Sequence, residues 1–291
     1  MRITLPPPNF SSKNLAPPQG GSWGVRGNDM TRIAETFARC KAAKRAAFIP
    51  FIMGGDPSLA ACAKLLDALP AAGADIIELG IPFSDPMADG PVIAEAGKRA
   101  LEAGASLHGI LEIAKVFRAK HATPLVLMGY LNPIYIYGYE KFAADAAASG
   151  VDGIIIVDLP PEEAAELEPM LAKHHIALVR LIAPTSVPER LPLLTKNASG
   201  YLYYVSITGI TGAGSAAASD VKEKIDAIRK ATHLPVCVGF GIKTATDVAA
   251  MAPLADGVVV GSALVKSIHE SNADLAAFSA YVRELADGCG Q

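Results

Sequence analysis

Short apolar runs rich in branched side chains alternate with longer segments of helical period from Met30 to the C-terminus. This alternation is typical of parallel strands joined by crossover helices. Nearly every run is apolar on both faces, as expected when a strand packs on a barrel interior and on a helix. Eight strands are predicted: Ala47 to Met53, Ile76 to Gly80, Leu125 to Met128, Gly153 to Val157, Ala177 to Leu181, Tyr201 to Val205, Val236 to Gly239 and Gly257 to Val260.

The segments between these runs predict amphipathic helices. Ser106, Thr244 and Asn272 are expected to cap the helices that follow them, because their side-chain oxygens can accept from free backbone N–H groups. An additional helix, Thr31 to Lys44, precedes the first strand and is expected to cover the bottom of a barrel. The other predicted helices are Ala60 to Leu69, Ile93 to Ala103, Leu107 to Lys120, Glu140 to Ala148, Pro161 to Lys173, Asp220 to Lys230, Ala245 to Met251 and Ala273 to Leu285.

Eight β/α units in series predict an α/β fold, a single (β/α)₈ TIM barrel with an extra N-terminal helix, over residues 30–291. An open, doubly wound sheet is the alternative. Residues 1–29 are rich in Pro, Gly, Ser and Asn and lack a continuous apolar segment, so we expect a disordered N-terminal extension and not a signal peptide. In a barrel, the chemistry is expected at the C-terminal ends of the strands.

Composition narrows the class of partner. A net charge of −3, from 26 Lys and Arg against 29 Asp and Glu, offers no basic surface for nucleic acid. Every hydrophobic stretch is interrupted well before the roughly 20 residues of a membrane span. The four cysteines are scattered without the close pairs of metal sites, so a reducing cytoplasm and no bound metal are expected; they are Cys40, Cys62, Cys237 and Cys289.

Two carboxylates near the end of the second strand are candidates for acid–base chemistry. Glu78 lies inside an apolar strand, where a buried carboxyl is either hydrogen-bonded for structure or kept for proton transfer with a raised pKa. Asp89 lies eleven residues later in a loop with several Pro and Gly residues, where alone it reads as part of an Asp-Gly turn. A strand carboxylate beside an acidic loop at the catalytic face favours function for the pair.

Small residues follow three later strands. The stretch Ser206 to Asp220 is a flexible linker or, slightly favoured by its length, a mobile lid that excludes water. Glycines in Val238 to Ile242 and Val260 to Leu264, with the hydroxyl of Ser262, stand after the seventh and eighth strands, where barrels bind phosphate. Four aromatic side chains near the strand ends suit a flat apolar group, although most aromatics are core residues: Phe51, Tyr130, Tyr203 and Phe240.

Seven segments, in order and spacing, resemble the tryptophan synthase α chain family over the chain from about Met30 to the C-terminus. The second is very specific, whereas the phosphate glycines occur in many barrels. The segments are FIPFIMGGDP (Phe48 to Pro57), ELGIPFSDPMADGP (Glu78 to Pro91), MGYLNPI (Met128 to Ile134), VDLPPEE (Val157 to Glu163), YYVSITGITG (Tyr203 to Gly212), VGFGI and DGVVVGSALV (Asp256 to Val265).

The resemblance implies roles for individual residues. Glu78 matches the glutamate that shuttles a proton to and from C3 of the indole ring, and Asp89 the aspartate that accepts the indole N–H hydrogen. Tyr203 matches a tyrosine that positions Glu78, and Thr211 a lid threonine that closes onto Asp89, although Ile207 stands where some relatives carry arginine. Phosphate-binding positions fall on Gly212, Gly241, Gly261 and Ser262, and the indole pocket on Phe51, Tyr130 and Phe240.

The implied reaction is retro-aldol cleavage of indole-3-glycerol phosphate to indole and glyceraldehyde-3-phosphate in tryptophan biosynthesis. It needs no cofactor in this chain, and pyridoxal phosphate is expected only in a β chain that receives the indole within an α₂β₂ heterotetramer. The apolar segment Pro133 to Tyr139, read as a loop, and the nearby loop Ser84 to Met87 suit such a partner surface, although ordinary packing explains them too.

Three other functions are compatible with parts of the sequence. A stand-alone lyase that releases free indole would have the same site. A catalytically idle subunit that activates a β chain is disfavoured because both carboxylates are present. An isomerase or epimerase acting on a sugar phosphate accounts for the phosphate glycines but not for the segment Glu78 to Pro91.

Overall fold

The computed structural model describes residues 31–205, 214–239 and 241–290. Eight parallel strands pair in chain order, and β8 pairs with β1, so the sheet is a closed barrel and not an open sheet. The strands are β1 (Ala47–Met53), β2 (Ile77–Gly80), β3 (Leu125–Gly129), β4 (Gly153–Ile156), β5 (Ala177–Ile182), β6 (Leu202–Val205), β7 (Val236–Gly239) and β8 (Gly257–Val260).

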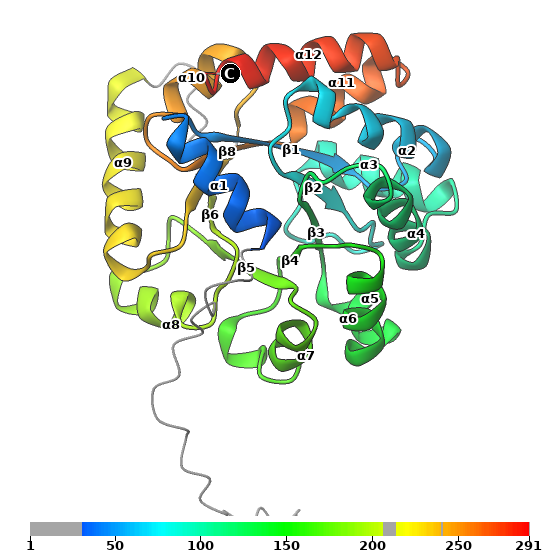
Figure 1. The fold of residues 1–291 in the computed structure, drawn as a ribbon, viewed down its shortest axis with the longest axis horizontal. Coiled ribbons are helices and arrows are strands. Elements are labelled where there is room, and N and C mark those ends of the chain that lie inside the picture. Colours follow the sequence, from blue (N-terminus) through cyan, green and yellow to red (C-terminus); the bar gives the residue numbers. More distant parts are fainter. Residues whose placement is uncertain (1–30, 206–213, 240, 291) are drawn as a thin grey trace, which may run out of the picture. The chain divides into compact units, whose positions relative to one another are not determined.

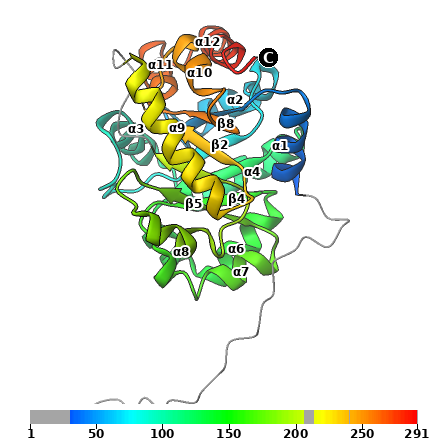
Figure 2. The same cartoon turned by 90° about the vertical axis from the view of Figure 1, so that its left-hand side faces the viewer.

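Helices surround this barrel on all the sides that Figures 1 and 2 show. They are α1 (Arg32–Ala42), α2 (Leu59–Ala68), α3 (Pro91–Glu102), α4 (Leu107–Arg118), α5 (Leu131–Tyr137), α6 (Tyr139–Ala148), α7 (Glu168–Lys173), α8 (Leu191–Thr195), α9 (Gly214–Ala231), α10 (Ala245–Met251), α11 (Ser262–Glu270) and α12 (Leu275–Asp287). Single 3₁₀ turns occur at Pro70–Ala72, Pro161–Glu163 and Pro188–Arg190.

The predicted barrel and all eight strands are confirmed. Strands β1, β7 and β8 have the predicted bounds, and each of the others differs by one residue at one end. The predicted extension, residues 1–29, lies outside the described residues. The lid predicted over Ser206 to Asp220 is helical in its second half, because α9 begins at Gly214. The first half of the predicted lid, residues 206–213, lies outside the described part.

Several helix predictions were wrong in detail. The segment Pro133 to Tyr139, read as a loop, is mostly helix α5, and α8 and α11 were not predicted. The single helix expected from Pro161 to Lys173 is a 3₁₀ turn followed by the short α7. Ser106 and Thr244 cap their helices as expected, with Ser106 Oγ accepting from Gly109 N at 3.2 Å.

Asn272 does not cap the last helix. The backbone at Asn272 and Ala273 is left-handed, with φ of 53° and 57°, so the chain cannot enter a right-handed helix there. The cap is Asp274, whose Oδ1 accepts from Ala277 N at 2.7 Å, and α12 begins at Leu275.

The apolar core has two layers. The outer layer lies between the strands and the surrounding helices, and the inner one fills the barrel with alternate strand residues. Helix α1 contributes Ile33, Phe37 and Cys40 to the inner layer, so it closes one end of the barrel as predicted. Figures 1 and 2 show α1 lying across that end.

A repeated hydrogen-bonded pair joins neighbouring strands at the same end. In each odd strand, the N–H group of the first or second residue donates to a polar side chain that lies just before the next strand. The four donor and acceptor pairs are Phe48 N to Asp75 (2.9 Å), Leu125 N to Asp152 (2.8 Å), Leu178 N to Ser199 (2.8 Å) and Val236 N to Asp256 (2.9 Å). Each of the three aspartates also binds an arginine: Arg45, Arg118 and Arg229.

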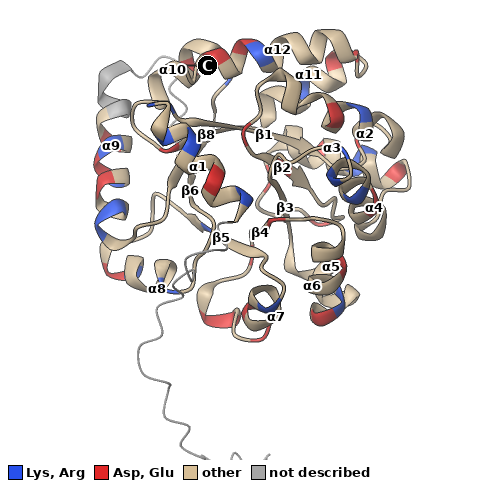
Figure 3. Ribbon diagram, viewed as in Figure 1, with Lys and Arg blue, Asp and Glu red and all other residues tan. Residues whose placement is uncertain are grey.

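Charged side chains lie mainly on the outer helices, where both signs are interspersed in the view of Figure 3. On α9, for example, Lys222 pairs with Asp226 four residues later at 2.5 Å. No helix among the described residues has the length and apolar character needed to cross a bilayer.

Candidate active site

Glu78 lies inside the barrel on β2, in register with Phe51 of β1 and Val126 of β3. Its side chain is completely buried, and the hydroxyl of Tyr201 donates to Glu78 Oε1 at 2.6 Å. The other oxygen, Oε2, has no hydrogen-bond partner among the described residues. Burial raises the pKa of Glu78 to about 7, and the Tyr201 hydrogen bond opposes that rise. The carboxyl can therefore both give and take a proton near neutral pH.

Tyr201 is a site residue that the sequence analysis missed. It immediately precedes β6, two residues before Tyr203, and both side chains belong to the inner layer. The signal was the period of two along a strand, which puts Tyr201 and Tyr203 on one face. Tyr203 packs its ring against Gly239, where a Cβ atom would come within 2.5 Å of the Tyr203 hydroxyl oxygen.

Asp89 lies at the barrel mouth in the loop between β2 and α3. Its N–H donates to Pro86 O at 3.0 Å, so the turn here has Met87 and Ala88 at its centre and is not the expected Asp-Gly turn. The Asp89 side chain is half-buried. Burial raises the pKa of Asp89, and the Tyr130 hydroxyl opposes that rise. Asp89 thus remains in contact with solvent and with a hydroxyl donor. Glu78 Oε2 has neither among the described residues.

Tyr130 braces this acidic loop from the end of β3. Its hydroxyl oxygen accepts from Ala88 N at 2.9 Å, and its ring centroid lies 5.3 Å from that of Phe83. Of the three residues predicted for the indole pocket, Tyr130 therefore also fixes the loop that carries Asp89.

Phe51 lies beside a predicted phosphate glycine. A Cβ atom on Gly261 would stand 3.5 Å from the Phe51 side chain, and one on Gly80 would meet the Phe51 ring at 2.9 Å. The glycine at position 80 therefore leaves room for the Phe51 ring, whereas a Cβ atom on Gly261 would make an ordinary van der Waals contact with it.

The predicted phosphate residues that the structure describes lie at the ends of β7 and β8. Gly241 has a φ of 71°, a left-handed conformation that favours glycine. Gly261 precedes α11 without a side-chain cap, and Ser262 begins that helix, so its first N–H groups face the barrel end without a capping side chain. Thr211, Gly212 and Phe240, as well as Ile207, lie outside the described residues.

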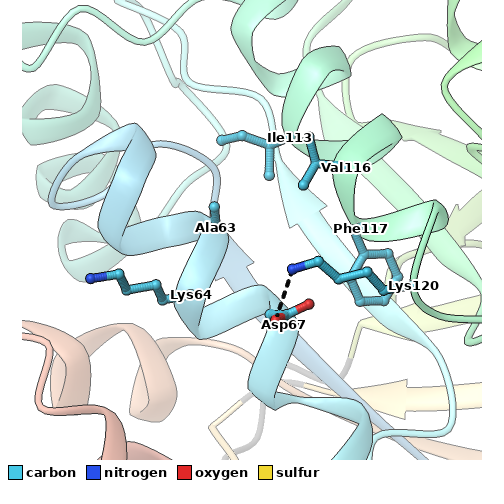
Figure 4. A pocket seen from close by; sticks show the side chains of 7 residues that line it. All are labelled: Ala63, Lys64, Asp67, Ile113, Val116, Phe117 and Lys120. Carbon is cyan, nitrogen blue, oxygen red and sulfur yellow. Dashed lines mark hydrogen bonds and ion pairs between the residues drawn. The ribbon is translucent and has the colours of Figure 1, made fainter.

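Beside the acidic loop, the mouth carries exposed apolar side chains. Met87 of the loop is 88% exposed, and Tyr135 and Ile136 of α5 are 67% and 77% exposed. We call these three residues the mouth patch. A different hollow, about 110 Å³, lies on the outer layer between α2 and α4, where Figure 4 shows Lys120 reaching Asp67. Among the described residues, no group of three or more His, Cys, Asp or Glu side chains could hold a metal ion.

Comparisons with known proteins identify the family. The family model described as tryptophan synthase alpha chain matches residues 37–289. The chain belongs to the tryptophan synthase alpha chain family. Among its relatives, the tryptophan synthase alpha chain of Acidiphilium cryptum is 55% identical over 240 residues, covering 82% of this chain and 87% of that protein. That of Caulobacter vibrioides is 53% identical over 245 residues, covering 84% and 89%.

Solved structures agree with this assignment. The crystal structure of tryptophan synthase subunit alpha from Legionella pneumophila is similar at a TM-score of 0.83 and 40% identity, covering 90% of this chain and 99% of that one. A structure of Mycobacterium tuberculosis tryptophan synthase is similar at a TM-score of 0.82 and 37% identity, covering 90% of this chain and 99% of that one. Tryptophan synthase alpha chains are lyases that cleave indole-3-glycerol phosphate to indole and glyceraldehyde-3-phosphate in tryptophan biosynthesis, and this chain is one of them.

Proposed function

We propose that Glu78 is the proton carrier of this cleavage and that Asp89 is the fixed negative charge. The observation that carries the proposal is the environment of Glu78, which is fully buried, has one oxygen without a hydrogen-bond partner among the described residues, and has a pKa raised to about 7. Burial raises the pKa of Asp89, but its side chain is still partly exposed and the Tyr130 hydroxyl opposes the rise, which suits a carboxylate that stays ionised.

The two roles account for every proton and electron pair. Glu78 gives its proton to C3 of the indole ring, and Asp89 stabilises the cationic ring by accepting the indole N–H hydrogen bond. The Glu78 carboxylate then takes the proton of the glycerol hydroxyl next to the ring. As that hydroxyl becomes the aldehyde, the carbon–carbon bond breaks, and its electrons return to the ring to give indole. Glu78 ends the cycle protonated.

The remaining predicted residues would bind and enclose the substrate. Gly241, Gly261 and Ser262 offer backbone N–H groups and a hydroxyl to the phosphate, with Gly212 from the lid. Phe51, Tyr130 and Phe240 would enclose the indole ring. Thr211 would close onto Asp89, and Tyr203 would support Glu78 from the same face as Tyr201.

The test is the loss of cleavage in matched variants. Glu78→Gln and Asp89→Asn are each expected to lower the kcat for indole-3-glycerol phosphate by at least about a hundredfold, the scale of acid–base catalysis. Asp85→Asn is the control, since Asp85 is exposed on the same loop and its carboxylate accepts a hydrogen bond from the neighbouring Ser84 Oγ at 2.5 Å. Cleavage within tenfold of wild type in Glu78→Gln, with circular dichroism unchanged, would overturn the assignment.

We further propose that the chain works with a β chain in an α₂β₂ heterotetramer in the cytoplasm, passes indole to it, and itself uses no cofactor, the pyridoxal phosphate belonging to the partner. The exposed mouth patch beside the Asp89 loop supports a partner surface at the barrel mouth. All four cysteines are unpaired, which suits a reducing compartment.

The measurement is indole release by the purified chain with and without a β chain. Strong stimulation of kcat by the β chain is expected. An equal rate in both assays would instead favour the stand-alone lyase, which has the same site.

A further inference from the structure

Helix α1 reaches the catalytic carboxyl through two successive contacts. The ring of Phe37 on α1 packs against the ring of Tyr201, with centroids 5.8 Å apart and planes tilted by 58°. The hydroxyl at the far end of Tyr201 donates to Glu78 Oε1 at 2.6 Å. Both aromatic side chains and Glu78 are buried inside the barrel. The end of the barrel opposite the mouth is thus in contact with the reacting group through a single tyrosine.

The helix itself is held firmly in that place. Arg32 Nε donates to Asp152 Oδ1 at 2.6 Å, and Arg39 pairs with Asp75 at 3.8 Å. Asp152 and Asp75 are two of the aspartates that accept N–H groups near the starts of β3 and β1. Phe37 is therefore carried on a helix whose position is set by the starts of the strands.

We propose that Phe37 is a positioning residue for Glu78, which it serves by holding the Tyr201 hydroxyl at hydrogen-bonding distance from the carboxyl. The inference rests on the proposed role of Glu78 as proton carrier. Tyr201 needs such a support because, among the described residues, its side chain forms a hydrogen bond only through the hydroxyl at its tip, whereas its ring is held by packing. A smaller side chain at position 37 leaves space into which the ring can turn.

If Phe37 no longer supports Tyr201, the change in the pKa of Glu78 depends on the groups that surround Glu78. The titratable groups that face it are Tyr201 and Tyr203 on the β6 side and Cys237 of β7. Burial raises the pKa of each of these three well above its ordinary value, so all three stay neutral while Glu78 titrates. Because the Tyr201 hydrogen bond lowers the pKa of Glu78, weakening that bond raises it.

The experiment follows Glu78 by the infrared carbonyl band of its protonated carboxyl, identified by its absence in Glu78→Gln. In full-length protein, Phe37→Leu is expected to raise the Glu78 pKa by about half a unit or more, and Tyr201→Phe by about one unit. The matched control is Phe278→Leu, the same change at a fully buried phenylalanine of α12 in the outer layer. It is expected to lower stability by a similar amount and leave the Glu78 pKa unchanged.

A double-variant comparison tests whether Phe37 acts through the tyrosine. In the Tyr201→Phe background, Phe37→Leu is expected to add no further shift, because the hydroxyl it positions is gone. An equal shift in both backgrounds, or no shift beyond that of Phe278→Leu, would overturn the proposal. If Phe37→Leu does not fold, Phe37→Met fills more of the space and must give a smaller shift of the same sign.

This experiment separates the inference from the proposed function. The infrared titration reports the position of the Tyr201 hydroxyl whether or not Glu78 carries the proton in the reaction. Cleavage that survives in Glu78→Gln would refute the role of Glu78 and leave the titration result standing. An unchanged titration in Phe37→Leu would refute the role of Phe37 and leave Glu78 as the proton carrier.

Discussion

At the scale of single residues, the burial of Glu78 connects catalysis to stability. A carboxyl whose pKa is raised on folding costs the native state nothing at low pH, where it is protonated in both states. The cost grows as the pH rises from the ordinary value of 4.5 to the folded value of about 7 and is constant above it. The same burial that prepares Glu78 for proton transfer therefore destabilises the protein at neutral and alkaline pH.

Glu78→Gln is consequently expected to be more stable than wild type at alkaline pH. The amide keeps an oxygen for the Tyr201 hydroxyl but cannot ionise, so the gain in free energy of unfolding should rise by about 3 kcal/mol between pH 4 and pH 8. Urea unfolding of both proteins at the two pH values measures it. A difference that does not change with pH would mean that Glu78 titrates normally in the folded protein.

Sequence reasoning found Glu78 because a charged residue inside an apolar strand conflicts with the cost of burying it. It missed Tyr201 because a tyrosine at the edge of an apolar run looks like any core aromatic. Only the closed barrel shows that Tyr201 and Glu78, 123 positions apart in the chain, meet inside it. Contacts of this kind depend on the register of strands that do not neighbour each other, which no local pattern encodes.

At the scale of elements, the aspartates just before β2, β4 and β8 (Asp75, Asp152 and Asp256) contribute to stability in a way that surface ion pairs do not. Asp152 accepts from Leu125 N, Arg118 and Arg32, and it is almost fully buried. Its removal leaves the buried Leu125 N–H group without its acceptor and takes the carboxylate partner from the Arg118 guanidinium, which keeps only backbone carbonyls.

Asp152→Ala is therefore expected to lower the free energy of unfolding by about 3 kcal/mol or more. Asp67→Ala is the control, since Asp67 is exposed and pairs with Lys120 at 3.2 Å and His121 at 2.7 Å; it should cost no more than about 1 kcal/mol. Denaturant unfolding of both variants measures the difference. Equal losses of unfolding free energy in the two variants would show that Asp152 stabilises the protein no more than a surface ion pair does.

Strands were easier to predict than helices for a physical reason. A strand buried on both faces must be continuously apolar, and eight such runs were visible. The helix expected from Pro161 to Lys173 was divided because Pro169 has no N–H group and fits only in a first turn, so α7 begins just before it at Glu168. Helix α5 was missed because its aromatic and branched residues, with Pro133 in its first turn, resemble a loop.

At the scale of the whole molecule, the two ends of the barrel have different tasks. At one end, α1 closes the barrel, and Asp75, Asp152 and Asp256 accept N–H groups near the strand starts. The other carries Asp89, Tyr130 and the mouth patch. A partner that docks on the mouth patch would lie next to the loop that holds Asp89, so docking and catalysis are expected to be coupled there.

Ile136→Lys is expected to weaken stimulation by a β chain without changing cleavage by the chain alone. A buried interface residue replaced by a charge should raise the β-chain concentration for half-maximal stimulation by about tenfold or more. Val116→Lys is the control, since Val116 is 54% exposed beside the hollow between α2 and α4 (Figure 4) and away from the strand ends. If both variants respond alike to the β chain, the mouth patch is not the docking surface.

The central claim is that the barrel holds Glu78 ready to exchange a proton near neutral pH, and direct titration of this one carboxyl tests it. The protein labelled with ¹³C at glutamate side-chain carboxyls would be followed by NMR from pH 4 to pH 9, with Glu78→Gln to assign the signal. The account predicts a midpoint at about pH 7. A midpoint close to 4.5, the ordinary value for glutamate, would contradict it.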